Sequence, residues 1–411
     1  MNPFSAWLRD ARRQPDTRYV DTCDGVRAAA IMIVAWFHIW QQSWLYPGLE
    51  LFGRHISFDP LVRSGYIWVD VMILVSGFCM YLSFDRQLGE RGRLMPTADF
   101  YARRLIRIHP SYMLTIIIML IVALATDAYH SQAHFRRDLL SHLTYTHMIF
   151  YDAYYATNLG SSLWTLAVEL QFYLIFPLIF RAFRKLPATT FAVMTAAALA
   201  FRGYVGQTFE DVSIYFNQLP AYLDTFAFGM AAAAVHVRWS HRRHGALTRI
   251  VCSAVCVLLC MALWQVVRAQ SACSGTEAIR MGQMNNRLAM GLLGSALLLC
   301  SAHAGWVVRH ILANPVTKFL SAVSLQFYIW HQTLAVWIRQ MRLIPSEAVN
   351  PNYEGDIVWQ RWYTLACFGI ALALAALLTY GFEKPAARWL QNKWDALRAR
   401  RREKRTKTAE E

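Results

Sequence analysis

Ten apolar segments, each of about the length that crosses a bilayer, dominate this sequence. A helix needs about 20 apolar residues to span the hydrocarbon core. Such windows lie near residues 26–46, 64–84, 111–126, 163–183, 187–201, 219–237, 249–267, 287–308, 316–338 and 362–382. Backbone polar groups inside a membrane must be satisfied within the chain, so these segments are expected to be helices. The sequence therefore predicts an all-α polytopic membrane protein with about ten transmembrane helices.

The composition agrees with a membrane protein and argues against a soluble one. Hydrophobic residues make up 56% of the 411 residues and charged residues only 16%, whereas soluble domains carry about 25% charged residues. The net charge of +15 is concentrated in the loops and the C-terminal tail, so it does not require a nucleic-acid partner. The expected partner is the lipid bilayer, with no nucleic acid.

The distribution of Lys and Arg predicts the orientation. With the N-terminus in the cytosol, the cytosolic loops and ends carry 28 of these residues and the opposite loops 11, and cytosolic loops carry the excess in membrane proteins. Both termini are therefore expected in the cytosol. We expect a cytosolic N-terminal segment (1–25) without a cleavable signal peptide, a transmembrane domain (26–382), and a basic cytosolic tail (383–411) that is disordered at its end.

The cysteines indicate neither a metal site nor a disulfide framework. The eight cysteines are scattered, and most lie in apolar segments. No CxxC pair or other metal-ligand spacing occurs. We therefore expect no metal and no permanently bound cofactor.

One predicted span carries two ionisable residues, Arg27 and His38. Eleven residues separate them, which corresponds to about 16 Å of rise and about three turns of an α-helix. The two side chains therefore share one helix face, with Arg27 at the cytosolic mouth and His38 beyond the midplane. An ionisable residue inside a membrane is costly, and it is a functional hypothesis by default.

Three other ionisable residues are expected at the depth of His38. At about 1.5 Å per residue, Asp70 and Glu169 lie about 9 Å from the outer ends of their spans, and His331 lies about 22 Å from the inner end of its span. In a core about 30 Å thick, all of them fall in the outer half. This placement indicates that they converge on one site.

A basic cluster is expected at the cytosolic face, at the depth of Arg27. It consists of Arg103, Arg104, Arg107 and His109, which directly precede the third span. The planar guanidinium fork binds phosphate well, although basic residues at this position would also simply set the orientation. An acyl-coenzyme A carries phosphates at one end and a thioester at the end of a long arm. It therefore fits an anion site at the cytosolic face with a His/carboxylate site deeper in the membrane.

The order and spacing of seven motifs resemble the membrane acyltransferase-3 family. The first motif, DGVRAAAIMIVAWFH (24–38), resembles the family signature in which ten residues separate an arginine from a histidine. The others are WVDVMILVSGF (68–78), FYARRLIRIHPSY (100–112), LWTLAVELQFYLIFP (163–177), DTFAFGM (224–230), SLQFYIWH (324–331) and YGFEKP (380–385). Together they cover nearly the whole chain.

The resemblance implies a ten-span enzyme of the bacterial inner membrane. Such enzymes pass an acyl group, commonly acetyl from cytosolic acetyl-CoA, to a hydroxyl group of a glycan or a lipid-linked sugar. Many relatives carry an appended extracytoplasmic hydrolase-like domain, and we expect this chain to lack one. The identity of the acceptor and the oligomeric state are not indicated.

We expect His38 and Glu169 to be the catalytic residues. An imidazole titrates near neutrality and suits a general base, while a buried structural histidine is the alternative. Glu169 would orient the imidazole, bind the acceptor, or serve as a protonated structural acid. A covalent acyl-enzyme on Ser76 or Ser324 stays open, although no GxSxG motif is present.

The other expected site residues fall into two groups. The acyl-donor site is expected to contain the four arginines Arg27, Arg103, Arg104 and Arg107. For Arg27, the alternative is that its side chain reaches the interface without binding a ligand. The pocket or acceptor site is expected to be lined by Asp70, Tyr173, Ser324, Tyr328 and His331.

Two rival functions are compatible with a polytopic chain that carries buried charges. A transporter is one, but the sequence lacks the two related halves that many transporters show. The other is a haem protein with His38 and His331 as axial ligands, which predicts a Soret absorption band.

Overall fold

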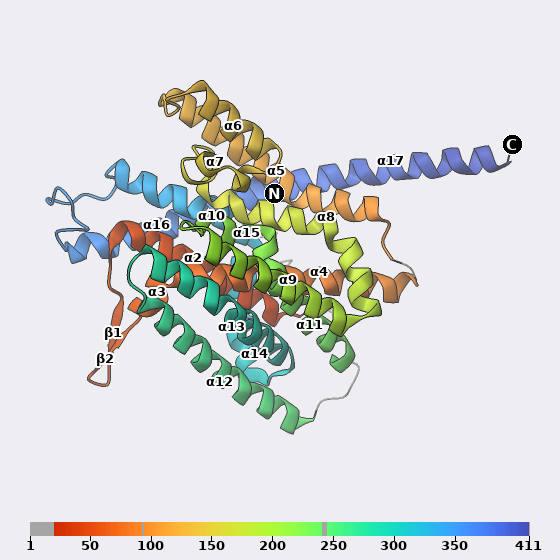
Figure 1. Ribbon diagram of the computed structural model, residues 1–411, viewed down its shortest axis with the longest axis horizontal. Helices are drawn as coiled ribbons and strands as arrows, with labels where there is room; N and C mark the ends of the chain where they lie inside the picture. Colours follow the sequence, from red (N-terminus) through yellow and green to blue (C-terminus); the bar gives the residue numbers. More distant parts are fainter. Residues whose placement is uncertain (1–19, 93, 241–244, 411) are drawn as a thin grey trace.

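The computed structural model describes residues 20–92, 94–240 and 245–410. Within these residues the chain is almost entirely helical, and the only sheet is an antiparallel hairpin of β1 (Gly48–Leu51) and β2 (Arg54–Ser57). Figure 1 shows the long helices packed side by side, with the hairpin extending from one end of the bundle. The predicted all-α membrane architecture is confirmed.

A long helix occupies each of the ten predicted spans. These helices are α2 (Thr22–Ser43), α4 (Val69–Arg91), α5 (Thr97–Ala125), α8 (Trp164–Lys185), α9 (Pro187–Thr208), α11 (Leu223–Ser240), α12 (Ala246–Ser271), α13 (Thr276–His303), α15 (Pro315–Gln340) and α16 (Ile357–Leu378). Shorter helices and turns connect them: α3 (Asp59–Arg63), η1 (Gly65–Trp68), α6 (Gln132–Leu143), η2 (His147–Ile149), α7 (Tyr151–Tyr155), η3 (Ser161–Leu163), α10 (Ser213–Phe216), η4 (Leu219–Tyr222) and α14 (Trp306–Leu312).

Fewer than ten of these helices are apolar enough to cross a membrane by themselves. In the described part of the chain, seven helical segments have the length and composition of a span, and α13 with α14, bent by 116°, would form an eighth. The remaining two predicted spans, α11 and α15, are outside this set. Helix α15 carries Lys318, Gln326 and His331, and α11 carries Asp224 and His236. These polar residues lower the hydropathy of helices that pack inside the bundle.

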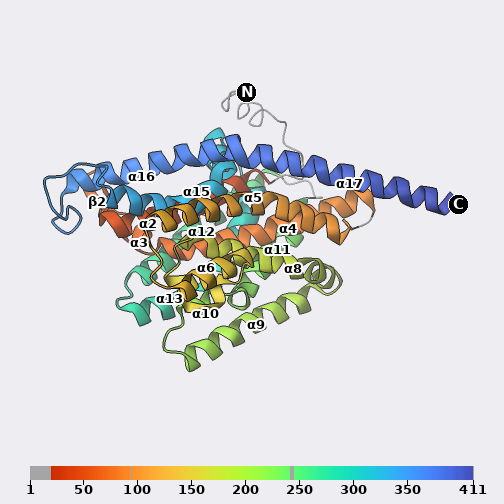
Figure 2. The same cartoon turned by 90° about the horizontal axis from the view of Figure 1, so that it is seen from above.

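The C-terminal segment is helical. The sequence had predicted a tail that is disordered at its end. A π-helical turn, η5 (Thr379–Glu383), joins α16 to α17 (Lys384–Glu410). In Figure 2, α16 and α17 form a nearly straight rod that extends beyond the bundle. Most of the predicted N-terminal segment (1–25), and residue 411, lie outside the described residues.

Small residues allow the central helices to approach closely. A Cβ atom on Gly229 of α11 would lie 2.1 Å from the backbone oxygen of Leu74 on α4, and one on Gly25 of α2 would lie 2.2 Å from that of Leu312. Such contacts leave no room for a side chain, as is typical of helix pairs in membranes. They position α2 and α4, which both contribute to the candidate site.

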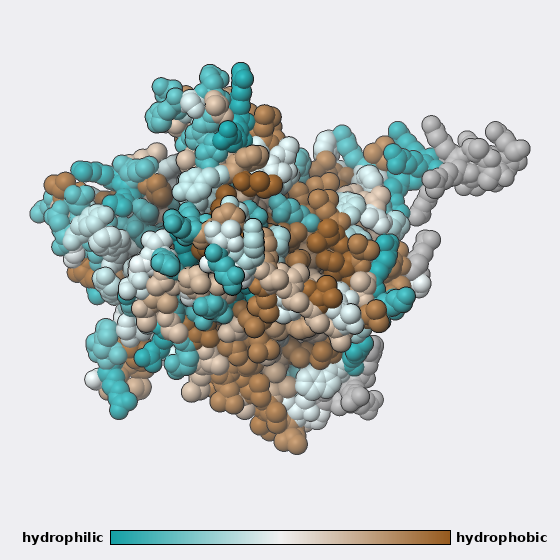
Figure 3. All heavy atoms as spheres, viewed as in Figure 1, coloured by the Kyte–Doolittle hydropathy of each residue, from teal (hydrophilic) through white to brown (hydrophobic). Residues whose placement is uncertain are grey.

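The outer surface has the character expected of a lipid-facing protein. Apolar side chains cover much of the middle of the face seen in Figure 3, while hydrophilic side chains gather toward its left end and top. The exposed large apolar residues include six on α12: Leu247, Ile250, Val251, Val257, Leu258 and Met261. A bilayer would shield such a surface from water.

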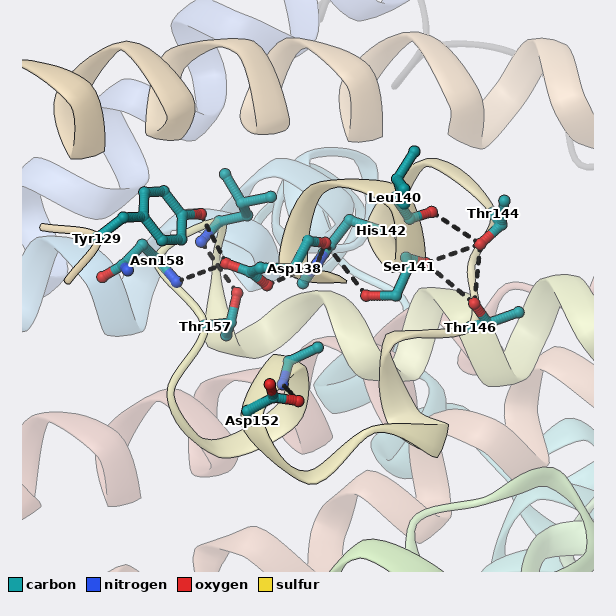
Figure 4. A network of polar contacts seen from close by, with 12 residues as sticks. Tyr129, Asp138, Leu140, Ser141, His142, Thr144, Thr146, Asp152, Thr157 and Asn158 are labelled. Carbon is teal, nitrogen blue, oxygen red and sulfur yellow. Dashed lines mark hydrogen bonds and ion pairs between the residues drawn. The ribbon is translucent and has the colours of Figure 1, made fainter. Parts of the chain in front are cut away.

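A polar network holds the segment between α5 and α8 (Figure 4). Asp138 Oδ2 accepts hydrogen bonds from the Tyr129 hydroxyl (2.7 Å) and the Asn158 backbone (3.1 Å), and Oδ1 lies 3.1 Å from His142 Nδ1. Burial alone would raise the pKa of Asp138, but the hydrogen bonds and His142 keep it below its usual value. The ring of His142 stacks on that of His147, with 4.0 Å between their centroids. Burial lowers the pKa of His147 well below its usual value.

Candidate active site

A narrow pocket lies among α2, α4, α5, α8 and α15, and we call it the inner pocket. Its volume is about 80 Å³. Seven of the site residues predicted from the sequence line it: Arg27, Arg104, Arg107, Glu169, Tyr173, Ser324 and Tyr328. Residues from five helices, separated by up to 301 positions along the chain, therefore meet in one cavity.

Two hydroxyl groups hold the carboxylate of Glu169 in this pocket. Ser76 of α4 donates a hydrogen bond to Oε1, and Tyr173 donates one to Oε2 over 3.1 Å. Glu169 and Tyr173 are four residues apart on α8, so they lie on the same helix face. The guanidinium of Arg104 lies 5.4 Å from the centre of the Tyr173 ring. The pocket thus combines one anchored carboxylate with arginine side chains.

A wider cavity of about 440 Å³ adjoins the inner pocket, and we call it the vestibule. Three residues, Arg27, Cys79 and Arg107, line both cavities. The guanidinium of Arg27 donates a hydrogen bond to Cys79 Sγ over 3.3 Å. The vestibule also contains Arg86. Arg27 is thus positioned where a ligand in the vestibule would extend into the inner pocket.

His38 lies next to His331 and outside the lining of the inner pocket. The two ring centroids are 5.2 Å apart. The Nδ1 atom of His38 is 3.0 Å from the Gln41 amide oxygen, which can only accept, so Nδ1 carries the proton and Nε2 the lone pair. Gln41, and not Glu169, is therefore the group that orients the His38 imidazole.

His331 has a free ring nitrogen. Its Nδ1 donates to the backbone oxygens of Tyr328 (2.7 Å) and Phe327 (3.1 Å). Its Nε2 has no hydrogen-bond partner among the described residues, and the side chain is buried. Tyr328 connects the two parts of the site, because it lines the inner pocket and its ring lies 5.7 Å from that of His331.

The arrangement of the two histidines does not fit a haem. Axial ligation, with metal–nitrogen bonds of about 2 Å on each side, would put two imidazole centroids about 6 Å apart across a porphyrin plane. The rings of His38 and His331 are closer than that and tilted by 52°.

The structure does not bring Asp70 or Arg103 into the inner pocket. Asp70 is buried and pairs with Arg287 of α13 over 3.2 Å. Arg287 also donates to the Phe216 backbone oxygen (2.7 Å) and the Tyr222 hydroxyl (3.0 Å). Arg103 is exposed and does not line the inner pocket, whereas Arg104 and Arg107 of the same helix do.

Comparison with known proteins identifies the chain. A family model described as an acyltransferase domain (Acyl_transf_3) matches residues 21–381. The chain belongs to the acyltransferase-3 family. It therefore carries an acyltransferase domain over almost its whole length.

Two relatives illustrate the similarity to other acyltransferase-3 proteins. The peptidoglycan O-acetyltransferase OatA of Listeria monocytogenes is 26% identical over 178 residues, which are 41% of this chain and 25% of that protein. YrhL of Bacillus subtilis, named as a candidate peptidoglycan O-acetyltransferase, is 23% identical over 392 residues, 90% of this chain and 55% of that protein. The chain thus spans between a quarter and about half of the length of these relatives. No solved structure matches it.

Sequence reasoning missed the buried arginines of this acyltransferase-3 domain. Besides Arg287, Arg202 of α9 is buried and bonds to Asp224 over 2.9 Å and to the Ala221 backbone oxygen over 2.8 Å. Arg287 reaches the same Ala221 oxygen over 3.4 Å. Arg202 directly follows the predicted span 187–201, and Arg287 is the first residue of the predicted span 287–308. Asp70 and Asp224 could have pointed to these arginines, because a buried aspartate in a span needs a cationic partner.

Proposed function

We propose that this acyltransferase-3 protein is an O-acyltransferase of the bacterial inner membrane. It moves an acyl group, acetyl in the simplest case, from cytosolic acyl-CoA to a hydroxyl group of a glycan or lipid-linked sugar on the extracytoplasmic side. The observation that carries the proposal is the succession of polar groups from Arg27 through the inner pocket and Tyr328 to the pair of His331 and His38. Donor binding and base chemistry would thus occur at opposite ends of one path.

The donor would enter through the vestibule. Its phosphates would bind near Arg27 and Arg107, because guanidinium groups form strong, charge-assisted hydrogen bonds to phosphate. The vestibule holds about 440 Å³ and the inner pocket about 80 Å³. The wide part suits the nucleotide, and the narrow part suits the thin pantetheine arm. Arg104 and Glu169 would contact that arm.

His38 would act on the acceptor hydroxyl. Its Nε2, which carries the lone pair, takes the hydroxyl proton while the oxygen attacks the thioester carbonyl. The carbon–sulfur bond then breaks, and the proton passes to the CoA thiolate. The products are the O-acyl ester and free CoA, so atoms and charge balance in a direct transfer. His331, with its unpartnered Nε2, would accept a hydrogen bond from the acceptor or from His38.

Transfer of label tests the proposal. The purified protein in nanodiscs would be incubated with [14C]acetyl-CoA and a glycan extract, and acid-stable label on the glycan would be counted. We expect transfer by the wild type and a loss of at least 100-fold for His38→Ala, within the range that a general base contributes. His55→Ala is the matched control, because His55 lies on the exposed hairpin. Absence of acyl-CoA binding to the wild type would refute the donor assignment and leave transport to be tested.

A further inference from the structure

A third cavity lies beyond the two histidines, at the ends of the helices that carry them. We call it the outer cavity; its volume is about 520 Å³. Gln42 of α2 lines it, one turn or about 6 Å beyond His38, and Arg339 of α15 lines it, about 12 Å beyond His331. The segment 341–356 and the start of α16 complete its wall. By the predicted orientation, this cavity opens on the extracytoplasmic side.

The guanidinium of Arg339 in this cavity has only neutral hydrogen-bond partners. Its Nη1 donates to the Gln42 amide oxygen over 3.2 Å, and its Nη2 lies 3.5 Å from the Asn352 amide oxygen. Among the described residues, no carboxylate forms an ion pair with Arg339. Two neutral amides thus orient the fork of this arginine and leave its charge uncompensated.

A buried donor in the same cavity also has no partner. Asn352 is only 3% exposed, and its Nδ2 forms no hydrogen bond among the described residues. Buried amide groups are normally satisfied, so an unpaired one indicates a missing acceptor. A ligand oxygen placed between Asn352 and Arg339 would satisfy both groups.

The acidic residues of the same segment are engaged elsewhere. Asp356 caps α16 through the Trp359 backbone (3.0 Å) and accepts from the Ser346 hydroxyl (2.7 Å). Glu354 accepts from the Asn350 backbone over 2.8 Å. Neither these carboxylates nor Glu347 line the cavity, whose charged lining residues are Arg339 and Arg342. The cavity is therefore cationic.

We propose that the outer cavity binds the acceptor and that this acceptor is a saccharide bearing a carboxylate. The Arg339 fork would take the carboxylate in charge-assisted hydrogen bonds. The amides of Gln42, Asn350 and Asn352 both donate and accept, which suits ring hydroxyls. The volume is in the range of small-ligand sites. The inference rests on the proposed function, because only an acyl acceptor needs a site next to His38.

Binding in the absence of donor tests this inference separately from the proposed function. Saturation-transfer NMR on the nanodisc-embedded protein would compare glucuronic acid, glucose and glucose 6-phosphate. We expect glucuronic acid to bind at least tenfold more tightly than glucose, and Arg339→Gln to abolish the difference. Arg339→Lys should retain part of it, and Arg54→Gln, on the exposed hairpin, is the matched control.

Three results would overturn the inference. They are equal binding of glucose and glucuronic acid by the wild type, undiminished glucuronic acid binding by a folded Arg339→Gln variant, and tighter binding of glucose 6-phosphate than of glucuronic acid. The wild-type comparison holds even if the variant does not fold. A protein that binds glucuronic acid and transfers no acetyl group would refute the proposed function and not the cavity's ligand class.

Discussion

His38 and His331 lie on different helices with their ring centroids 5.2 Å apart, and each imidazole carries its proton on Nδ1. Gln41 fixes the first ring, and the backbone of Tyr328 fixes the second. Both rings therefore present Nε2 as the basic nitrogen. Tyr328, whose ring is near that of His331, lines the inner pocket, and Gln42 and Arg339, further along the two helices, line the outer cavity. Under the proposed function, acyl transfer takes place at this pair.

Removing the partner of His38 should slow transfer without affecting donor binding. Gln41→Leu deletes the amide oxygen that holds the imidazole in its tautomer. A hydrogen bond of this kind contributes about 0.5–1.5 kcal/mol, so the transfer rate should fall about 2- to 12-fold. The rate would be measured at saturating acetyl-CoA and the dissociation constant by titration. An unchanged rate would show that Gln41 does not orient the base.

The pair of Asp70 and Arg287 should matter mainly for stability. Removing one partner of a buried ion pair costs about 3–5 kcal/mol, because the other charge is left uncompensated. We expect Asp70→Asn and Arg287→Met to lower the midpoint of thermal unfolding strongly, and the double variant to unfold at a higher temperature than either single variant. A stable Asp70→Asn protein that has lost transfer would instead make Asp70 a site residue.

Cys79 provides a direct probe of the donor path. Its side chain lines both the vestibule and the inner pocket, 3.3 Å from Arg27. We expect acetyl-CoA to slow its alkylation by N-ethylmaleimide at least fivefold, as measured by mass spectrometry of the labelled peptide. Cys273, in the turn between α12 and α13, is the internal control and should react at the same rate with and without donor. Equal rates at Cys79 would place the donor elsewhere.

The segment between α5 and α8, which contains His147, should lose stability in acid. Because burial lowers the pKa of His147 below 6.5, the unfolded chain binds this proton more readily than the folded one. Its contribution to stability is complete above about pH 6.5 and decreases below it, by at most about 1.4 kcal/mol per pH unit. The midpoint of thermal unfolding should fall less between pH 7.5 and pH 5.5 for His147→Gln than for the wild type. The exposed-site variant His55→Gln should behave as the wild type does.

Hydropathy located the helices well but could not place them relative to one another. All ten predicted segments coincide with long helices, because the length of an apolar run reports burial in lipid. The spacing of Arg27 and His38 also predicted that their side chains share one helix face. The sequence did not indicate which residues on different helices lie next to each other. Asp70, for example, pairs with a residue 217 positions away.

The candidate site was likewise only partly predictable from the sequence. Most residues of the inner pocket belong to motifs that sequence inspection singled out, whereas Arg202 and Arg287, which lie within α9 and α13, belong to none of them. The outer cavity involves Arg339 and Asn352, which belong to no motif. Their proximity depends on how the 341–356 segment folds back over α15. Such a fold has no periodic signature in the sequence.

The central claim is that Arg27 serves the donor while His38 serves the chemistry. The most direct measurement determines the acetyl-CoA dissociation constant and the single-turnover transfer rate on the same nanodisc preparations of Arg27→Ala and His38→Ala. We expect Arg27→Ala to weaken binding at least tenfold, and His38→Ala to bind normally while transferring at least 100-fold more slowly. Weakened binding by His38→Ala with normal transfer at saturation, or normal binding and transfer by Arg27→Ala, would contradict the account.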